Sequence, residues 1–264
     1  MSQLIIRELN ERNIFKHSHD FNLSIHSLST LALDLFYTII CQIKNEDQCF
    51  NQFIISISDL EKRMHGSNSD YRINRESLKK AIKDLMNESI EFNTGNDCGA
   101  YQWFNSFFVS SEQGYIHFEI NDQFKEHLLQ LDKYVKGNLV SFLNLKSVYS
   151  KRIYLIMCQY ASMGHTTVLL EDLNTRLQTP DSLKTYSNFK ARVLETAKKE
   201  INEFTELNIE YKAIKIGRSV NDIKFSIKRK IEKVNTNNSS KAGITAAQEF
   251  IDSSQEEIID IEVA

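Results

Sequence analysis

The stretch that decides the fold spans residues 186–205 and reads YSNFKARVLETAKKEINEFT. Its apolar residues recur at steps of three and four, which predicts one buried stripe of a helix. The stripe consists of Tyr186, Phe189, Val193, Ala197, Ile201 and Phe204. The opposite side carries Lys184, Asn188, Arg192, Glu195 and Lys199. That side is either a solvated outer face or a surface for a polyanion, and the flanking sequence decides between the two.

Basic residues are concentrated in the part of the chain that contains this helix. Residues 1–140 hold 14 basic against 19 acidic residues, and residues 141–233 hold 17 against 10. Residues 234–264 hold one lysine against six acids, so the total of −3 hides a segment of +7 between two segments of −5. Such an asymmetry favours binding to nucleic acid.

The composition is that of a globular protein. The chain has 264 residues, of which 41% are hydrophobic and 25% charged, enough for one large domain or two of ordinary size. No apolar run is long enough to span a bilayer, and the first residues, MSQLIIRELNERN, lack the apolar core of a signal peptide. We therefore expect a cytoplasmic protein.

The predicted elements around the opening helix follow the order of a winged helix-turn-helix. A helix over 148–162 precedes a short strand over 166–170 and a second helix over 170–179, which Pro180 ends. After the third helix come two strands, LNIEYKAIK and IKFSIKR, joined by the turn-like IGRSVND.

The first half of the chain repeats this order. Its predicted elements are helix 28–44, strand 53–57, helix 58–64, helix 74–90 with Asn74 as N-cap, a hairpin of YQWFNSFFVSSE and GYIHFEIN, and a final helix over DQFKEHLLQLDKY. The fold class is therefore α+β, with two tandem winged-helix domains related by internal duplication. The expected segments are an arm at 1–21, domains at 22–140 and 141–233, and a disordered acidic tail at 234–264.

Several motifs in this order carry a resemblance to a known family. They are YSKRIYLIMCQYAS, LEDLNTRLQ, YSNFKARVLETAKKEINEFTELNIEY and KIGRSVNDIKFSI in the second half, and SLSTLALDLFYTIICQIK, Leu78–Met86 and GYIHFEINDQFKEHLLQL in the first. From about Asn22 to Arg229 the chain resembles plasmid replication initiators of the iteron-binding Rep_3 family. Motifs, order and spacing agree together.

The resemblance implies sequence-specific binding to double-stranded DNA at direct repeats, the iterons, of a plasmid origin. Members of the family bind iterons as monomers, repress their own promoter at an operator as dimers, help melt an AT-rich segment, and recruit the host initiator and helicase. The alternative is a winged-helix transcriptional repressor with no role in origin opening, which would have the same recognition helix. A purely structural protein would leave the +7 segment unexplained.

Three groups of residues are candidates for DNA contact. On the C-terminal recognition helix they are Lys184, Ser187, Asn188, Lys190, Arg192, Lys198 and Lys199; in the wing and following strand they are Lys215, Arg218, Lys228, Arg229 and Lys230; on the N-terminal recognition helix they are Arg72, Arg75, Lys79, Lys80 and Lys83. Arg192 can bond guanine and Asn188 can bond adenine, whereas wing cations orient the protein on phosphates. Glu195 either accepts from cytosine or pairs with Lys199. Because the first half is acidic, we expect a weaker DNA footprint there, combined with dimerisation.

We expect neither catalysis nor a cofactor or metal. His17-Ser18-His19 is the sole trace of a nuclease-like histidine pair, and its segment lacks the pattern of a strand. We assign Tyr149, Tyr154 and Tyr160 to packing or surface roles, and no GxxxxGK[ST] loop is present. Of the four cysteines, Cys41 and Cys158 sit in apolar helical runs and are predicted to be reduced core residues.

Overall fold

A computed structural model provides the structure of the protein. It describes residues 14–23, 28–43, 53–65, 70–93, 98–110, 114–129, 131 and 133–230. The described residues through Arg229 belong to one compact unit. The predicted acidic tail lies outside the described residues. None of the described helices has the length and apolar character needed to span a bilayer.

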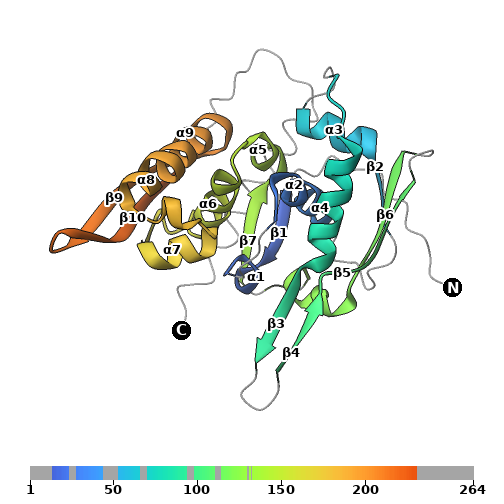
Figure 1. Ribbon diagram of the computed structural model, residues 1–264, viewed down its shortest axis with the longest axis horizontal. Coiled ribbons are helices and arrows are strands. Elements are labelled where there is room, and N and C mark those ends of the chain that lie inside the picture. The colour runs from blue at the N-terminus through green and yellow to red at the C-terminus, as the bar shows by residue number, and fades with distance from the viewer. Residues whose placement is uncertain are drawn as a thin grey trace, which may run out of the picture. The chain divides into compact units, whose positions relative to one another are not determined.

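The N-terminal winged helix has the predicted order of elements (Figure 1). They are α2 (Thr30–Ile40), β2 (Phe53–Ser56), α3 (Ile57–His65), α4 (Arg75–Asn87), β5 (Phe104–Ser110) and β6 (Tyr115–Ile120). The strands form an antiparallel sheet in the order β2-β6-β5, in which β5 and β6 are the wing. The predicted N-cap is confirmed, because the Asn74 side chain accepts hydrogen bonds from the backbone N–H groups of Glu76 and Ser77.

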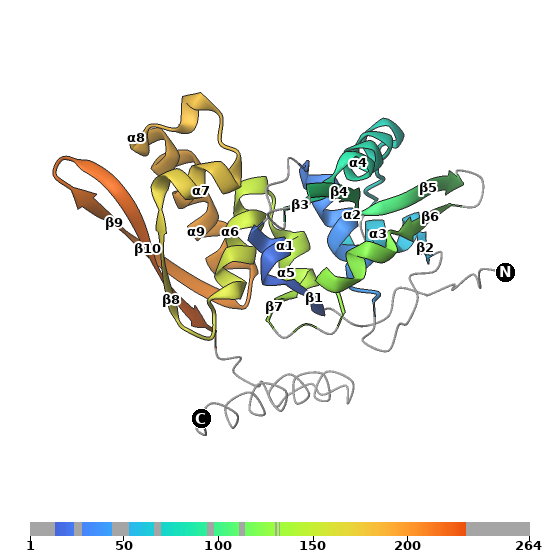
Figure 2. The same cartoon turned by 90° about the horizontal axis from the view of Figure 1, so that it is seen from below.

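The C-terminal winged helix repeats the arrangement. Its elements are α6 (Val148–Gln159), β8 (His165–Leu169), α7 (Leu170–Leu177), the 3₁₀ turn η2 (Asp181–Leu183), α8 (Tyr186–Phe189), the π turn η3 (Lys190–Leu194), α9 (Glu195–Phe204), β9 (Leu207–Ile216) and β10 (Ser219–Arg229). The antiparallel sheet has the order β8-β10-β9, with the helices on one of its faces (Figure 2). Alternation along β10 buries Ile223, Phe225 and Ile227 against those helices.

Other elements were not predicted. They are β1 (Ile14–Ser18), α1 (His19–Leu23), the hairpin of β3 (Ser89–Asn93) and β4 (Cys98–Gln102), β7 (Tyr134–Asn138) and α5 (Leu139–Asn144). The helix predicted over residues 122–134 is wrong beyond a short 3₁₀ turn, η1 (Asp122–His127), because the chain then enters β7. Strand β1 pairs antiparallel with β7, and the Phe15 ring lies where a Cβ atom on Gly137 would be.

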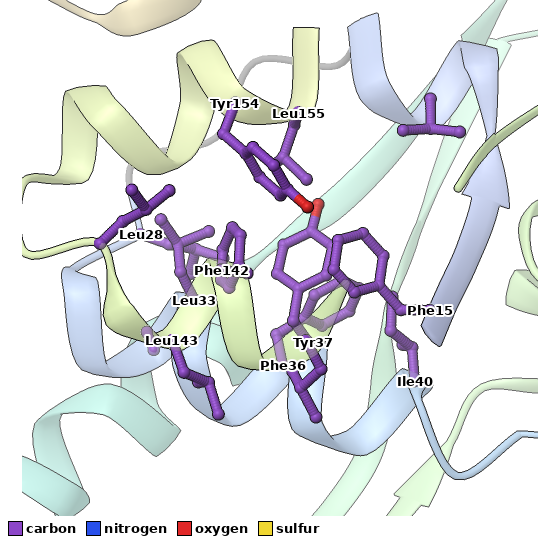
Figure 3. Close-up of a cluster of buried hydrophobic side chains, with 14 of the residues drawn as sticks. Phe15, Leu28, Leu33, Phe36, Tyr37, Ile40, Phe142, Leu143, Tyr154 and Leu155 are labelled. Atoms are coloured by element: carbon purple, nitrogen blue, oxygen red, sulfur yellow. The ribbon is translucent and has the colours of Figure 1, made fainter. Parts of the chain in front are cut away.

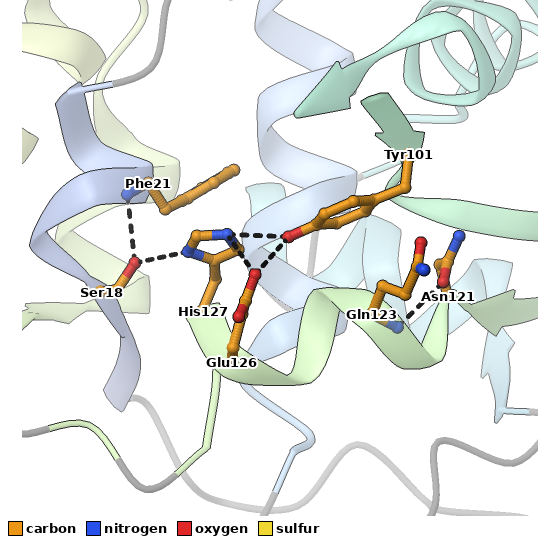
Figure 4. Close-up of polar contacts among 7 residues, drawn as sticks. All are labelled: Ser18, Phe21, Tyr101, Asn121, Gln123, Glu126 and His127. Atoms are coloured by element: carbon orange, nitrogen blue, oxygen red, sulfur yellow. Dashed lines mark hydrogen bonds and ion pairs between the residues drawn. The ribbon is translucent and has the colours of Figure 1, made fainter. Parts of the chain in front are cut away.

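A chain of hydrogen bonds attaches β1 to the N-terminal domain (Figure 4). The Ser18 hydroxyl bonds His127 Nδ1 at 2.9 Å, and His127 Nε2 bonds the Tyr101 hydroxyl at 2.9 Å. Tyr101 in turn donates to Glu126 at 2.9 Å. The backbone N–H of Phe21 donates to the Ser18 hydroxyl, so the start of α1 is fixed to η1 and β4.

The two winged-helix domains share one core (Figure 3). Phe15 of β1, Tyr37 of α2 and Phe142 of α5 pack their rings together, with centroids 4.4–5.8 Å apart, and Tyr154 of α6 joins them. As predicted, Cys41 and Cys158 are buried in the core, and the Cys41 thiol donates to the carbonyl of Ile14 at 3.3 Å. The sequence pattern of residues 148–162 predicts an amphipathic helix, but α6 is buried on all sides from Ser150 to Cys158.

Two cations of α6 are buried in this shared core. Lys151 Nζ lies 2.6 Å from Asp34 Oδ1 of α2 and donates to the backbone carbonyl of Phe142 at 2.7 Å. Burial raises the pKa of Asp34 to about 6, even though the ammonium opposes the shift. Arg152 donates to the carbonyl oxygen of Leu177 at 2.9 Å and to that of Leu28 at 3.5 Å.

Candidate nucleic-acid interface

The C-terminal recognition helix, Tyr186–Phe204, contains a π turn that changes its buried face. The N–H of Glu195 donates to the carbonyl of Lys190, five residues earlier. The buried residues are Phe189, Val193, Leu194, Ala197 and Ile201. The extra residue in the turn brings Leu194 into the core, and the prediction that Phe204 is buried is wrong, because its side chain is 41% exposed.

Most of the predicted base-reading residues lie on the exposed side of this helix. Ser187, Asn188, Lys190, Arg192 and Lys199 are exposed, whereas Lys198 is half-buried. Within the described part of the chain, the side chains of Lys190, Arg192 and Lys199 have no hydrogen bond or ion pair. A guanidinium that is exposed and uncommitted is free to bond a guanine edge.

Three of the contact residues predicted at the C-terminal recognition helix have protein partners. Lys184 Nζ lies 2.7 Å from Asp181 Oδ1 and lowers the pKa of that carboxyl. The Asn188 amide donates to the carbonyl of Ser182 at 2.9 Å, across the turn before the helix. Lys198 Nζ bonds Glu210 Oε2 at 2.7 Å. These interactions order the start of the helix and its contact with β9.

Four hydrogen bonds attach strand β9 to the recognition helix. Besides the bond from Lys198 to Glu210, the Tyr211 hydroxyl donates to Glu195 Oε1 at 2.6 Å. The Asn202 side chain accepts from the N–H of Ile209 at 2.6 Å and donates to its carbonyl at 2.9 Å. Burial and the Glu195 carboxylate both raise the pKa of Tyr211. The wing is therefore held at a fixed angle to the helix.

Sequence reasoning missed these positioning residues. The expected pairing of Glu195 with Lys199 is wrong, because the carboxylate bonds Tyr211, sixteen residues further along the chain. Only the role of Asn202 could have been predicted from the sequence. An asparagine near the end of an apolar helical stripe tends to form hydrogen bonds with nearby backbone groups.

The predicted wing cations fall into two separate places. Lys215 and Arg218 are exposed at the tip, where Gly217 has a φ of +62° and Ile216 pairs with Ser219. Lys228 and Arg229 end β10 opposite Asn208 and Leu207, and Lys230 follows. Because β10 has 11 residues, the two groups lie roughly 30 Å apart along the strand and do not form one patch.

The N-terminal recognition helix α4 exposes the predicted cations. It buries Leu78, Ala81 and Leu85, while Arg75, Lys79, Lys80 and Lys83 are exposed. Lys79 Nζ bonds Glu76 at 2.8 Å, and Arg72, before the helix, lies 3.8 Å from Glu61. In the described part of the chain the side chains of Lys80 and Lys83 make neither a hydrogen bond nor an ion pair.

Both histidines of the predicted pair contact protein groups. The expectation that its segment is not a strand is wrong, because Ile14–Ser18 forms β1. His17 is fully buried and its ring nitrogens contact the Ser18 carbonyl at 3.0 Å and the Tyr37 hydroxyl at 3.3 Å. His19 Nε2 bonds the carbonyl of Tyr134 at 3.1 Å. The described residues contain no group of three or more His, Cys, Asp or Glu side chains arranged to hold a metal ion.

The fold and its exposed basic helices define a DNA-binding protein with two tandem winged-helix domains. Residues 14–158 match the family described as "Initiator Replication protein, WH1", and residues 169–227 match "Initiator Rep protein, WH2". The chain belongs to this family of replication initiator proteins. The fold expected from the resemblance is confirmed.

The solved structures that are similar to the chain include the following two. One is the Pi initiator protein in complex with iteron DNA, with 18% sequence identity and a TM-score of 0.68 over 83% of this chain and 98% of that one. The other comprises domains 2 and 3 of RctB, with 14% identity and a TM-score of 0.49 over 79% of this chain and 84% of that one. The first likeness supports the fold described above.

Proposed function

We propose that this initiator binds tandem direct repeats, the iterons, at a plasmid origin and reads them with the face that contains Arg192. The observation that carries the proposal is the uncommitted Arg192 guanidinium on a helix whose wing is fixed by four hydrogen bonds. Wing cations that bond phosphates would orient the protein on the duplex, and side chains of the helix that bond base edges would select the sequence. The Pi initiator, which shares the fold, is described in complex with iteron DNA.

The remaining steps of initiation form part of the same proposal. The bound protein helps open an adjacent AT-rich duplex and recruits the host initiator and helicase, without catalysis of its own. The N-terminal domain adds a weaker contact through Lys80 and Lys83 and mediates dimerisation, and the dimer represses the promoter at an inverted-repeat operator. The enclosed His17 supports a non-enzymatic role, because its ring nitrogens contact protein groups.

The test is binding of the purified protein to duplexes tiled across its own replicon, at fixed near-physiological salt with competitor DNA. Wild type is expected to bind tightly only to tandem direct repeats. Arg192→Ala should weaken that binding by ~1–3 kcal/mol, as loss of a bidentate guanine contact would. Lys133→Ala is the matched control, since Lys133 is exposed but lies outside the predicted DNA face.

Two results would redirect the interpretation. Tight binding to a lone inverted repeat, with no affinity for direct repeats, would indicate a transcriptional repressor. Uniform weak binding that Arg192→Ala leaves unchanged would show that the exposed side of the helix is solvated and reads no bases.

A further inference from the structure

We propose that Ile216, at the tip of the C-terminal wing, enters the minor groove of the bound DNA as an apolar wedge between base pairs. The inference rests on the proposed function in one respect, namely that the wing lies along duplex DNA beside the recognition helix. Ile216 is 68% exposed, the largest exposed fraction among the large hydrophobic side chains of the described residues. An isoleucine with this exposure has no packing role in the free protein.

The outer part of the wing is a ribbon without a core. Ala213 pairs with Ile223, and this is the last pair toward the tip with a buried member. Beyond it the strands continue to the pair of Ile216 with Ser219, around the turn at Gly217 and Arg218. The tip projects past helices α7 and α8 (Figures 1 and 2). A side chain at this tip can reach a partner molecule before any other part of the sheet does.

Cations flank the isoleucine on both sides. Lys215 and Arg218 are exposed and have no ion pair within the described ranges. The minor groove is about 6 Å wide and is bordered by phosphates. Two cations can therefore bond the phosphates while the side chain between them meets sugars and base edges. An apolar residue inserted into the minor groove partly unstacks a base step and bends the duplex.

The wing is positioned to act at a fixed distance from the major-groove contact. Asn202, Glu195 and Lys198 hold the inner part of β9 against the recognition helix, so the base of the wing has a fixed position relative to Arg192. The wedge would then select a deformable pyrimidine–purine step at one offset from the bases that Arg192 reads. Such selectivity comes from the cost of deforming DNA and needs no hydrogen bond to a base.

The experiment compares Ile216→Ala and Arg218→Ala with Met163→Ala on short duplexes. Met163 is a matched control, because it is 62% exposed and lies beside Gly164, whose carbonyl bonds Ile227 at the opposite end of the sheet from the tip. Each duplex carries a fluorophore pair at its ends to report bending and 2-aminopurine at the step beneath the wing to report unstacking. Affinity is measured at several salt concentrations, on repeat DNA and on unrelated DNA.

Ile216→Ala should weaken repeat binding roughly tenfold, through lost apolar contact, and should remove both the bend and the 2-aminopurine signal. Its salt dependence should match that of wild type, whereas Arg218→Ala should reduce the salt slope by about one phosphate contact. Ile216→Leu should retain most of the bend. Met163→Ala should behave as wild type.

Equal affinity, bend and unstacking in Ile216→Ala and Met163→Ala would overturn the wedge and leave a wing that contacts phosphates only. The proposed function can fail separately. If wild type shows no preference for repeats, yet its bending of unrelated DNA still depends on Ile216, iteron recognition is rejected and the wedge is retained.

Discussion

At the scale of single residues, His17 shows how the interior holds a histidine neutral. Its ring stacks on Phe15 and packs edge-on to Phe21, and Nδ1 donates to the Ser18 carbonyl while Nε2 accepts from the Tyr37 hydroxyl. Burial lowers the pKa of His17 from 6.5 to about 4. The imidazole of His17 is therefore protonated below about pH 6.5 in the unfolded chain, but only below about pH 4 in the folded protein.

We predict that His17→Gln removes this part of the pH dependence of stability. The depressed histidine pKa makes wild type lose stability as the pH falls from 6.5 to 4, with no loss above 6.5. Urea unfolding at pH 7.5 and 4.5 should show the gap between wild type and variant narrowing on acidification by roughly 2–3 kcal/mol. Asp34, whose raised pKa acts in the opposite direction, is present in both proteins and cancels. If the stability difference between wild type and His17→Gln is the same at both pH values, the pKa of His17 is not lowered by folding.

Replacing Lys151 should be among the most destabilising single changes in the protein. Lys151→Met leaves the Asp34 carboxylate buried without its cation, which is expected to cost roughly 3–5 kcal/mol at pH 7. Adding Asp34→Leu removes the orphaned charge and should recover at least half of the loss, because well-packed apolar groups replace such pairs at little cost. Denaturant titration of both single variants and the double variant measures the coupling. If the losses in unfolding free energy of the two single variants simply add up in the double variant, Lys151 and Asp34 do not stabilise the protein as a coupled pair.

At the scale of elements, the junction of α9 and β9 determines how the wing is presented. Strand β9 is at the edge of its sheet, and Asn202 bonds both backbone groups of Ile209 as a neighbouring strand would. Asn202→Ala should cost about 2 kcal/mol of stability, because it leaves two backbone groups without partners. Hydrogen exchange at the Ile209 amide should accelerate, and affinity for repeats should fall more than affinity for unrelated DNA.

The matched control for this change is Asn208→Ala. The side chain of Asn208 is exposed on the same strand and, among the described residues, makes no hydrogen bond. It should leave exchange at Ile209 and the selectivity for repeats unchanged. Equal effects of the two alanine substitutions would mean that the Asn202 bonds do not set the wing angle.

The elements that could be predicted from the sequence are those with local signals. The apolar stripe of residues 186–205 and the N-cap Asn74 are readable because their partners lie within a few residues. Strands β1 and β7 are short and separated by more than one hundred residues, so no local pattern indicates that Phe15 will cover Gly137. The π turn escaped prediction because a 3.6-residue period gives no sign of where an extra residue enters a helix.

In the candidate DNA-binding site, the sequence predicts which side chains are exposed but not which partners they contact. Exposure of Arg192 and Lys199 follows from helical spacing alone, whereas spacing places Lys190 near the apolar stripe and the structure exposes it. The partners of Glu195 and Lys198 could not be predicted from spacing. Glu195 contacts Tyr211, and Lys198 contacts Glu210, only after the hairpin folds back on the helix. Sequence therefore indicates which cations are available to DNA, while the angle between helix and wing comes from tertiary contacts.

At the scale of the whole molecule, helix α6 serves both domains. Its Lys151 is bonded to α2 of the N-terminal domain, and its Arg152 donates to carbonyls in both halves. A domain boundary placed at residue 140 would separate groups that bury one another. Removing residues 1–140 should therefore expose the apolar surface of α6 and destabilise the C-terminal winged helix, in addition to removing any DNA contact made by α4.

The charge distribution of the whole chain leads to a last prediction, concerning residues 234–264. Without them the net charge of the chain changes from −3 to +2, because they contribute six acids and one lysine. If these acids compete with phosphates for the basic face, a chain ending at Lys233 should bind unrelated DNA several-fold more tightly at low salt. The difference should shrink as the Debye length falls below about 8 Å. A full-length chain with the six acids changed to amides should behave like the truncated one, whereas wild-type affinity in that chain would exclude charge as the cause.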